Sequence, residues 1–298
     1  MTDEKATRGT PPVDGRWLLA AVVLVVYCLL FAAPGRPALL SFWQAYGVDH
    51  RAPAFLDLRV VTTAPDAVRA GLDPLVENPR DPLKRPMNHP RVWTLLRHAG
   101  LSERHTVPLG FCLAAALLAS LLAMAGRLTS SEAMFYAILV CSPAGLMAAE
   151  RGNVDVLLFS LVSAATLFVT ERRTYLIGYA VIFVCAVLKL FPIFGFAFAL
   201  RERVRTGVAV LATAGFSFAA YLVIARHDVA KVISNSIQGV YLSYGGKVVF
   251  ERLRDYGIPL DPNVYSAVAV LIVTALALLI AWRVRLPMAY PGRRWRKC

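Results

Sequence analysis

A single aspartate, Asp57, lies in a setting that suits proton transfer. It follows Phe55-Leu56 and precedes Leu58 and Val60-Val61, so we expect apolar neighbours to surround its carboxyl group. Desolvation raises the proton affinity of a carboxyl group and makes it a usable general base near neutral pH. Four other acids of the same polar stretch have the composition of solvated surface charges: Asp49, Asp66, Asp73 and Asp81. Asp57 is therefore a candidate general base, and the alternative is that it is a solvated surface charge like the other acids.

A short polar turn further along the chain combines an arginine with helix-capping residues. In Glu150-Arg151-Gly152-Asn153-Val154-Asp155, Gly152 suits the turn, Asn153 suits the N-cap of the next helix, and Asp155 complements the helix dipole. This structural interpretation is complete in itself. A helix N-terminus beside an arginine is also a natural phosphate site, so Arg151 and Asn153 are candidates for binding a phosphate.

Lys189 is a third group with chemical potential. It lies within the apolar segment 175–200, at the break Lys189-Leu190-Phe191-Pro192. A charge within an apolar membrane segment is costly and is usually functional. The alternative is that Lys189 only satisfies a backbone carbonyl or an acid.

The composition is that of an integral membrane protein. Apolar residues make up 57% of the chain, and the mean hydropathy is +0.56. Backbone groups in lipid must be satisfied internally, so we expect the apolar runs to be helices. These runs are residues 17–33, 107–125, 133–149, 154–170, 175–200, 206–225 and 264–282. The first follows a basic tail, as in a signal peptide, but it is longer than the usual h-region, and we expect an uncleaved anchor.

The charge and cysteine patterns exclude other classes of protein. The net charge of +13 arises from Lys and Arg at the ends of apolar runs and in polar loops, so we expect membrane lipids as a partner and no nucleic acid. Neither a CxxC motif nor a Cys/His spacing is present, although four of the five cysteines lie inside apolar segments. We therefore expect no disulfide framework, no metal site and no cofactor.

The positive-inside rule sets the expected topology. If residues 175–200 form two short helices that turn back at Lys189, every basic cluster falls on the side of the N-terminal tail, whereas a single crossing places two clusters outside. We predict an all-α polytopic membrane bundle of about seven spans plus a re-entrant helix pair. The expected parts are a cytoplasmic tail at 1–16, a transmembrane domain at 17–282 with external loops at 34–106 and 226–263, and a basic cytoplasmic tail at 283–298.

The first external loop, 34–106, is the polar stretch that contains Asp57. Apolar residues interleaved with basic ones over 90–101 predict a short helix lying in the membrane interface. A second helix is expected at 65–70, closed by Gly71. Both helices have a plain alternative as packing and anchoring elements. This loop, the Arg151 turn and the Lys189 break all fall on the outer face in the expected topology.

The motifs follow one another in an order that resembles a known family. In chain order they are Asp57, Gly71-x-Asp73-Pro74, Asn88-His89-Pro90-Arg91-Val92-Trp93, Ser142-Pro143, Arg151-Gly152-Asn153-Val154-Asp155 and Leu188-Lys189-Leu190-Phe191-Pro192. This order resembles the C-type (GT-C) membrane glycosyltransferases and is most similar to glycosyltransferase family 87. The resemblance covers residues 17–244, and since members usually continue with further spans, it implies a C-terminally truncated chain.

The resemblance implies roles for individual residues. Described members use polyprenyl-phosphate mannose, so a polyprenyl-phosphate hexose is the expected donor and a lipid or cell-envelope glycan hydroxyl is the expected acceptor. Asp57 corresponds to the acid that activates the acceptor hydroxyl, and Arg151, Asn153 and Lys189 lie near the donor phosphate. Further candidates for substrate binding lie in the other motifs: Asp73, His89 and Arg91.

We therefore expect a multi-pass hexosyltransferase of the cell membrane with its active site on the outer face. Two alternatives remain from the sequence. A transporter or lipid flippase explains Lys189 and the broken helix equally well, but it leaves Asp57 and the long loop without a role. A non-catalytic membrane subunit is the other alternative.

Overall fold

The computed structural model describes residues 14–283, apart from 51, 172, 237–245 and 260. All regular elements in this part of the chain are helices, which confirms the expected all-α class. The chain divides into two compact units, Met1–Ser236 and Ile237–Cys298. In the second unit, α11 (Gly246–Asp255) packs against α12 (Pro262–Arg283).

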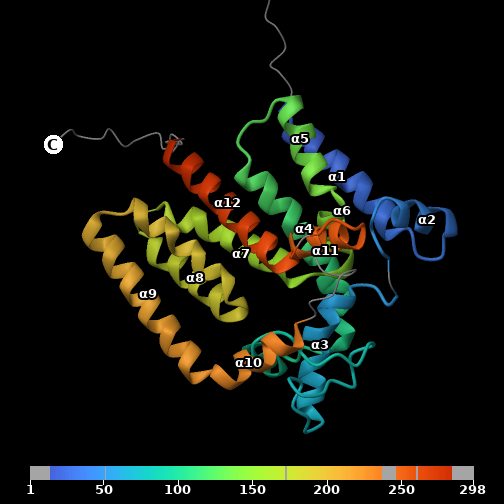
Figure 1. Ribbon diagram of the computed structural model, residues 1–298, viewed down its shortest axis with the longest axis horizontal. Coiled ribbons are helices and arrows are strands. Elements are labelled where there is room, and N and C mark those ends of the chain that lie inside the picture. Colours follow the sequence, from blue (N-terminus) through green and yellow to red (C-terminus); the bar gives the residue numbers. More distant parts are fainter. Residues whose placement is uncertain (1–13, 51, 172, 237–245, 260, 284–298) are drawn as a thin grey trace, which may run out of the picture. The chain divides into compact units, whose positions relative to one another are not determined.

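One group of helices shares a core in the first half of the chain (Figure 1). It comprises α1 (Arg16–Phe31), α2 (Pro37–Ala45), α4 (Thr106–Met124), α5 (Ser130–Val140) and α6 (Pro143–Arg151). Their interfaces bury small and aliphatic side chains, and the outward faces of α1 and α5 keep large apolar side chains exposed. Exposed apolar faces of this kind are expected where lipid replaces water.

A second core lies under the polar loop. It joins α3 (Leu56–Arg69), the 3₁₀ helix η1 (Arg91–Ala99), α7 (Val154–Val169) and α10 (Arg226–Asn235) to one side of α4. A short 3₁₀ turn, η2 (Glu103–His105), leads into α4. Figure 1 shows α9 leading into α10 close to the α3 region. The polar loop is therefore built into the helical bundle through an apolar core of its own.

The apolar segment 175–200 folds back on itself at Lys189. Helix α8 (Tyr175–Lys189) is followed at once by the 3₁₀ helix η3 (Phe191–Arg201), and α9 (Val204–Ile224) continues the chain. The Tyr179 and Phe196 rings stack with centroids 5.7 Å apart. These residues lie on opposite sides of the break, so the expected turn is confirmed, while its re-entrant course in a membrane stays a prediction.

The expected seven spans are not all confirmed. Two helices of the described part are long and apolar enough to cross a membrane, Glu103–Met124 and Val204–Ile224, and α5 with α6 makes a third if that bent pair is one span. Shorter apolar helices occupy the other expected spans, including α1, α7 and α8. The expected tails at 1–16 and 283–298 lie almost wholly outside the described residues.

Two local expectations were wrong, and one helix was not anticipated. The expected continuous run 133–149 is bent by 59° between α5 and α6, because Ser142 caps a new helix through a 3.3 Å bond from Gly145 N–H and Pro143 starts it. The helix expected at 65–70 already begins at Leu56, since its buried face continues through Pro65; only its end before Gly71, at φ +80°, was predicted correctly. No helix was expected at α2.

Candidate functional site

The Arg151 turn packs directly against the start of α3. Gly152 has φ +62°, and a Cβ added there would lie 3.0 Å from Leu58 Cβ and 3.2 Å from Phe55 Cβ. Only glycine fits both the left-handed backbone and this close approach. The side chain of Asn153 accepts a 2.9 Å bond from Asp155 N–H, which confirms the predicted N-cap of α7. The turn therefore brings the end of α6 beside Asp57 in the first turn of α3.

Asp57 lies in the partly buried setting that the sequence predicted. Its side chain is 27% exposed. Burial raises the pKa of Asp57 above that of an ordinary carboxyl group, and the positive charges of Arg151 and Arg85 partly oppose this effect, while the charge of Glu150 adds to it. A carboxylate with a raised pKa binds a proton more readily, as a general base requires.

Arg85 is a component of this site that sequence reasoning missed. Its guanidinium makes two 3.0 Å bonds to the carboxylate of Asp81, whose side chain is fully buried. The same group donates a 2.7 Å bond to Leu56 O and a longer, 3.4 Å bond to Asp57 Oδ1. Arg85 lies 28 residues from Asp57, in a proline-rich stretch with several arginines, so no spacing rule could have paired them.

A buried histidine and a buried acid form a pair next to the Arg151 turn. His50 Nδ1 is 3.0 Å from Glu150 Oε1, and both side chains are almost fully buried. The hydrogen bond to Glu150 raises the pKa of His50, against the effect of burial. This contact ties the chain before α3 to the end of α6 and so supports the position of the Arg151 turn. The sequence had assigned no role to either residue.

Lys189 forms an ion pair with Asp155, at 2.6 Å. An acidic partner is what the structural alternative for Lys189 required. Both side chains are partly exposed, 31% for Lys189 and 43% for Asp155, although the paired oxygen, Asp155 Oδ1, is itself buried. The end of α8 is fixed to the polar loop because Trp93 Nε1 donates a 3.0 Å bond to Leu188 O.

His89 is a buried residue close to the charges of Lys189 and Arg85. Its ring is buried and lies 6.1 Å from the Trp93 ring. Burial, together with the nearby charges of Lys189 and Arg85, lowers the pKa of His89 to about 3, so the ring is neutral at physiological pH. Its Nδ1 makes no hydrogen bond within the described part of the chain. The role predicted for His89 in substrate binding therefore stays a prediction.

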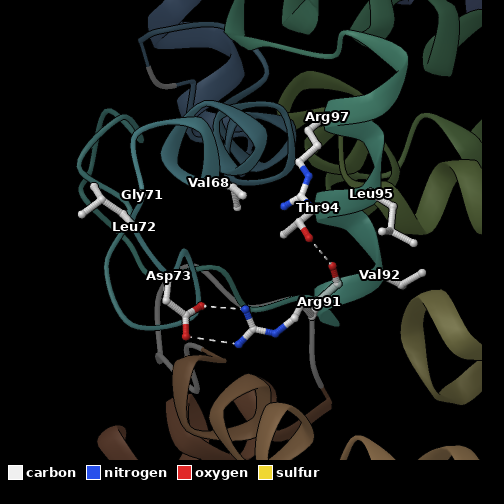
Figure 2. A pocket seen from close by; sticks show the side chains of 9 residues that line it. All are labelled: Val68, Gly71, Leu72, Asp73, Arg91, Val92, Thr94, Leu95 and Arg97. Atoms are coloured by element: carbon white, nitrogen blue, oxygen red, sulfur yellow. Dashed lines mark hydrogen bonds and ion pairs between the residues drawn. The ribbon is translucent and has the colours of Figure 1, made fainter.

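Asp73 and Arg91 are brought together, and neither is among the charges that shift the pKa of Asp57. Arg91 makes two 3.1 Å bonds to Asp73 (Figure 2) and bonds of 2.9 and 3.0 Å to Asp228 of α10, while Lys231 lies 3.2 Å from Asp73. These bonds raise the pKa of Arg91. Asn235 adds bonds to two backbone carbonyls of the loop. We call the four side chains Asp73, Arg91, Asp228 and Lys231 the ionic clamp, since they fasten α10 to the loop.

The described residues hold no group of three or more His, Cys, Asp or Glu side chains arranged to bind a metal ion. The cations that act on the Asp57 carboxylate are Arg85 and Arg151, whereas Lys189 lies with Arg85 near His89. Such a set can accept a proton and stabilise an anion next to it.

The comparisons with known proteins give one match. The profile of glycosyltransferase family 87 matches residues 101–296. The match includes Arg151, Asn153 and Lys189, whereas Asp57 and the loop motifs lie before it. No curated protein and no solved structure matches the chain. Since the match covers well over half of the sequence, and apolar helices of spanning length are present, the chain belongs to glycosyltransferase family 87 and is a membrane glycosyltransferase.

Proposed function

We propose that this glycosyltransferase moves one hexose, mannose by resemblance to described family members, from a polyprenyl-phosphate donor to a hydroxyl of a lipid or glycan acceptor at the outer face of the cell membrane. The observation that carries the proposal is the pairing of a half-buried carboxylate, Asp57, with the cations Arg151 and Arg85. A flippase has no need of a base with a raised proton affinity, and the family match favours transfer.

The proposed reaction breaks the bond between the anomeric carbon and the donor phosphate oxygen. The acceptor hydroxyl attacks that carbon and gives its proton to Asp57, and the polyprenyl phosphate leaves with the electron pair of the broken bond. Negative charge therefore grows on the phosphate as the sugar departs. Cations that meet this charge stabilise the transition state more than the bound donor, and each charge-assisted contact contributes roughly 1.5 to 3 kcal/mol.

Arg151 and Lys189 are the proposed partners of that phosphate, with Asn153 at the helix N-terminus beside them. Lys189 already has a carboxylate partner, Asp155, at 2.6 Å. An arriving phosphate would share the ammonium group with Asp155, which both side chains permit because they are partly exposed. The side-chain oxygen of Asn153 accepts the capping bond from Asp155 N–H. The side-chain nitrogen of Asn153 is the group proposed to donate to the phosphate.

The proposal is tested with the purified full chain, labelled polyprenyl-phosphate mannose or glucose, and a membrane lipid extract as the acceptor pool. Asp57→Asn keeps the size of the side chain and removes the proton acceptor, so transfer should fall by roughly 10² to 10⁴-fold. Asp66→Asn is the matched control, because Asp66 belongs to the same helix and pairs instead with Arg69 at 2.6 Å. Near-normal turnover by Asp57→Asn, with loss in Asp66→Asn, would show that the wrong carboxylate was chosen.

A further inference from the structure

A separate cavity lies at the far end of α3 from Asp57 (Figure 2). It has a volume of about 560 Å³ and is bounded by the end of α3 with its following turn on one side and by η1 on the other. Asp57 and Val68, the first lining residue, are eleven positions apart on α3, which corresponds to about 17 Å at the rise of an α-helix. A small group held in this cavity is therefore too far from Asp57 to be the reacting sugar.

The charged residues Asp73 and Arg91, which line one side of the cavity, already have hydrogen-bond partners. Both oxygens of Asp73 accept from Arg91, and Asp73 also accepts from Leu75 N–H and pairs with Lys231. These interactions use the usual acceptor capacity of a carboxylate. Within the ionic clamp, two carboxylates balance two cations, so the clamp contributes a rigid wall and no net charge.

Arg97 supplies the charge that is not balanced. Figure 2 shows its side chain extending from η1 into the cavity toward Thr94. Its Nε donates a 3.2 Å bond to His98, and within the part of the chain that the structure describes no carboxylate lies at ion-pair distance from it. Its backbone is held in place because Arg69 donates bonds to the carbonyls of Arg97 and Leu101.

The remaining polar group is the Thr94 hydroxyl. It donates a 2.8 Å bond to Arg91 O, which leaves its lone pairs for a ligand hydroxyl. Val68 contributes aliphatic surface to the wall, whereas the Leu72 side chain points away from the cavity (Figure 2). A guanidinium fork fits the oxygens of a phosphate in two-pronged geometry, and a hydroxyl acceptor at an aliphatic wall suits a polyol beside it.

We propose that this cavity binds a phosphate group with adjoining hydroxyls through Arg97 and Thr94, at a site distinct from the Asp57 centre. The phosphate can be carried by a lipid headgroup or by a soluble ester, since both present the same chemistry. A further step rests on the proposed function: the bound group is the phosphate-bearing end of the acceptor, held while its distant hydroxyl reaches Asp57.

Binding is measured by calorimetric titration of the detergent-solubilised full chain in about 0.15 M salt. At this ionic strength the Debye length is about 8 Å, so attraction between distant exposed charges is largely screened. The probes are inorganic phosphate and dihexanoyl phosphatidylglycerol. Arg97→Met should weaken both by about tenfold or more, the effect of one charge-assisted contact, and Val68→Trp, which fills the cavity without removing a charge, should do the same. Tighter binding of the lipid identifies a headgroup site, and equal binding identifies a site for soluble phosphate esters.

The matched control is Arg104→Met, which removes an exposed cation of the same loop that does not line the cavity. Its binding should equal that of the unaltered chain. Equal losses in Arg97→Met and Arg104→Met would mean general attraction by a basic surface and would overturn the proposal, as would unchanged binding in both Arg97→Met and Val68→Trp.

The acceptor assignment is tested apart from the binding. In transfer assays, Arg97→Met should raise the acceptor KM by about tenfold and leave kcat and the donor KM nearly unchanged, because the contact lies far from the reacting bond. Asp57→Asn, which should be inactive, should still bind phosphate as the unaltered chain does. Normal binding by Asp57→Asn with full activity would refute the proposed function alone, whereas an unchanged acceptor KM in Arg97→Met would refute only the acceptor assignment.

Discussion

Removal of Arg85 should shift the acid limb of the pH–rate profile upward. If Asp57 is the base, transfer requires its ionised form, and kcat/KM falls as the pH drops through its pKa. Burial already raises that pKa, and the Arg85 charge opposes the rise. Arg85→Met takes away this opposition, so the limb should move further toward neutral pH, with unchanged rates well above it.

The size of the shift follows from the contact geometry. The bond from Arg85 to Asp57 is 3.4 Å long, and the same guanidinium is shared with Asp81 at 3.0 Å, so we take the low end of a charge-assisted hydrogen bond, about 1.5 kcal/mol. That value corresponds to about one pKa unit, because one unit equals 1.36 kcal/mol. At pH values below the pKa of Asp57, transfer by Arg85→Met should therefore be about tenfold slower than transfer by the unaltered chain at the same pH.

The assay is initial-rate transfer from labelled donor between pH 4.5 and 8, normalised to folded protein. Arg85→Lys should give a smaller shift, since it keeps the charge and loses the fork. Arg80→Met, an exposed arginine of the same loop, is the control and should leave the profile unchanged. An acid limb in Arg85→Met that coincides with that of Arg80→Met would refute the assignment of Arg85 to Asp57.

Three further results are expected. The contribution of His89 to the free energy of unfolding should fall by about 1.4 kcal/mol per pH unit below about 6.5, because unfolded His89 takes up a proton that the buried ring refuses until about pH 3. The raised pKa of Asp57 acts in the opposite direction, so the quantity to compare is the slope of the unaltered chain with that of His89→Gln, by chemical denaturation at pH 5 and 7. Gly152→Ala should lower stability by at least about 1 kcal/mol, because an added Cβ meets Leu58 and the backbone has a φ of +62°. Thermal unfolding measures the loss, and an unchanged midpoint would mean that the packing around Gly152 is loose. Lys189→Met should lower kcat by roughly ten- to a hundredfold while stability falls by less than about 1 kcal/mol, since its pair with Asp155 is partly exposed; the reverse pattern would assign Lys189 a structural role.

The sequence predicted local settings better than it predicted partners. Apolar neighbours along the chain were enough to anticipate the half-buried carboxyl of Asp57 and the direction of its pKa. The Gly152 turn and its Asn153 cap follow from residue chemistry within four positions, and both were confirmed. The break at Lys189 followed from a lysine and a proline in an apolar run.

Contacts between distant parts of the chain could not be predicted in this way. The sequence allowed an acid as the partner of Lys189 but could not choose Asp155. It offered Asp73 and Arg91 as substrate contacts, and nothing local indicated that Arg91 would also bind Asp228, 137 residues further on. Such pairings depend on how helices pack, and a single sequence does not reveal that packing through periodicity or turn chemistry.

The bond between Trp93 and Leu188 also bears on the order in which the protein is made. A helix ends with carbonyls that have no partner within it, and here one of them is satisfied by an indole synthesised 95 residues earlier. The loop that contains α3 is likewise fastened by Asn235, which follows Leu75 by 160 residues. The loop therefore leaves the ribosome long before the segments that hold it, and its final shape must wait until α8 and α10 have been synthesised.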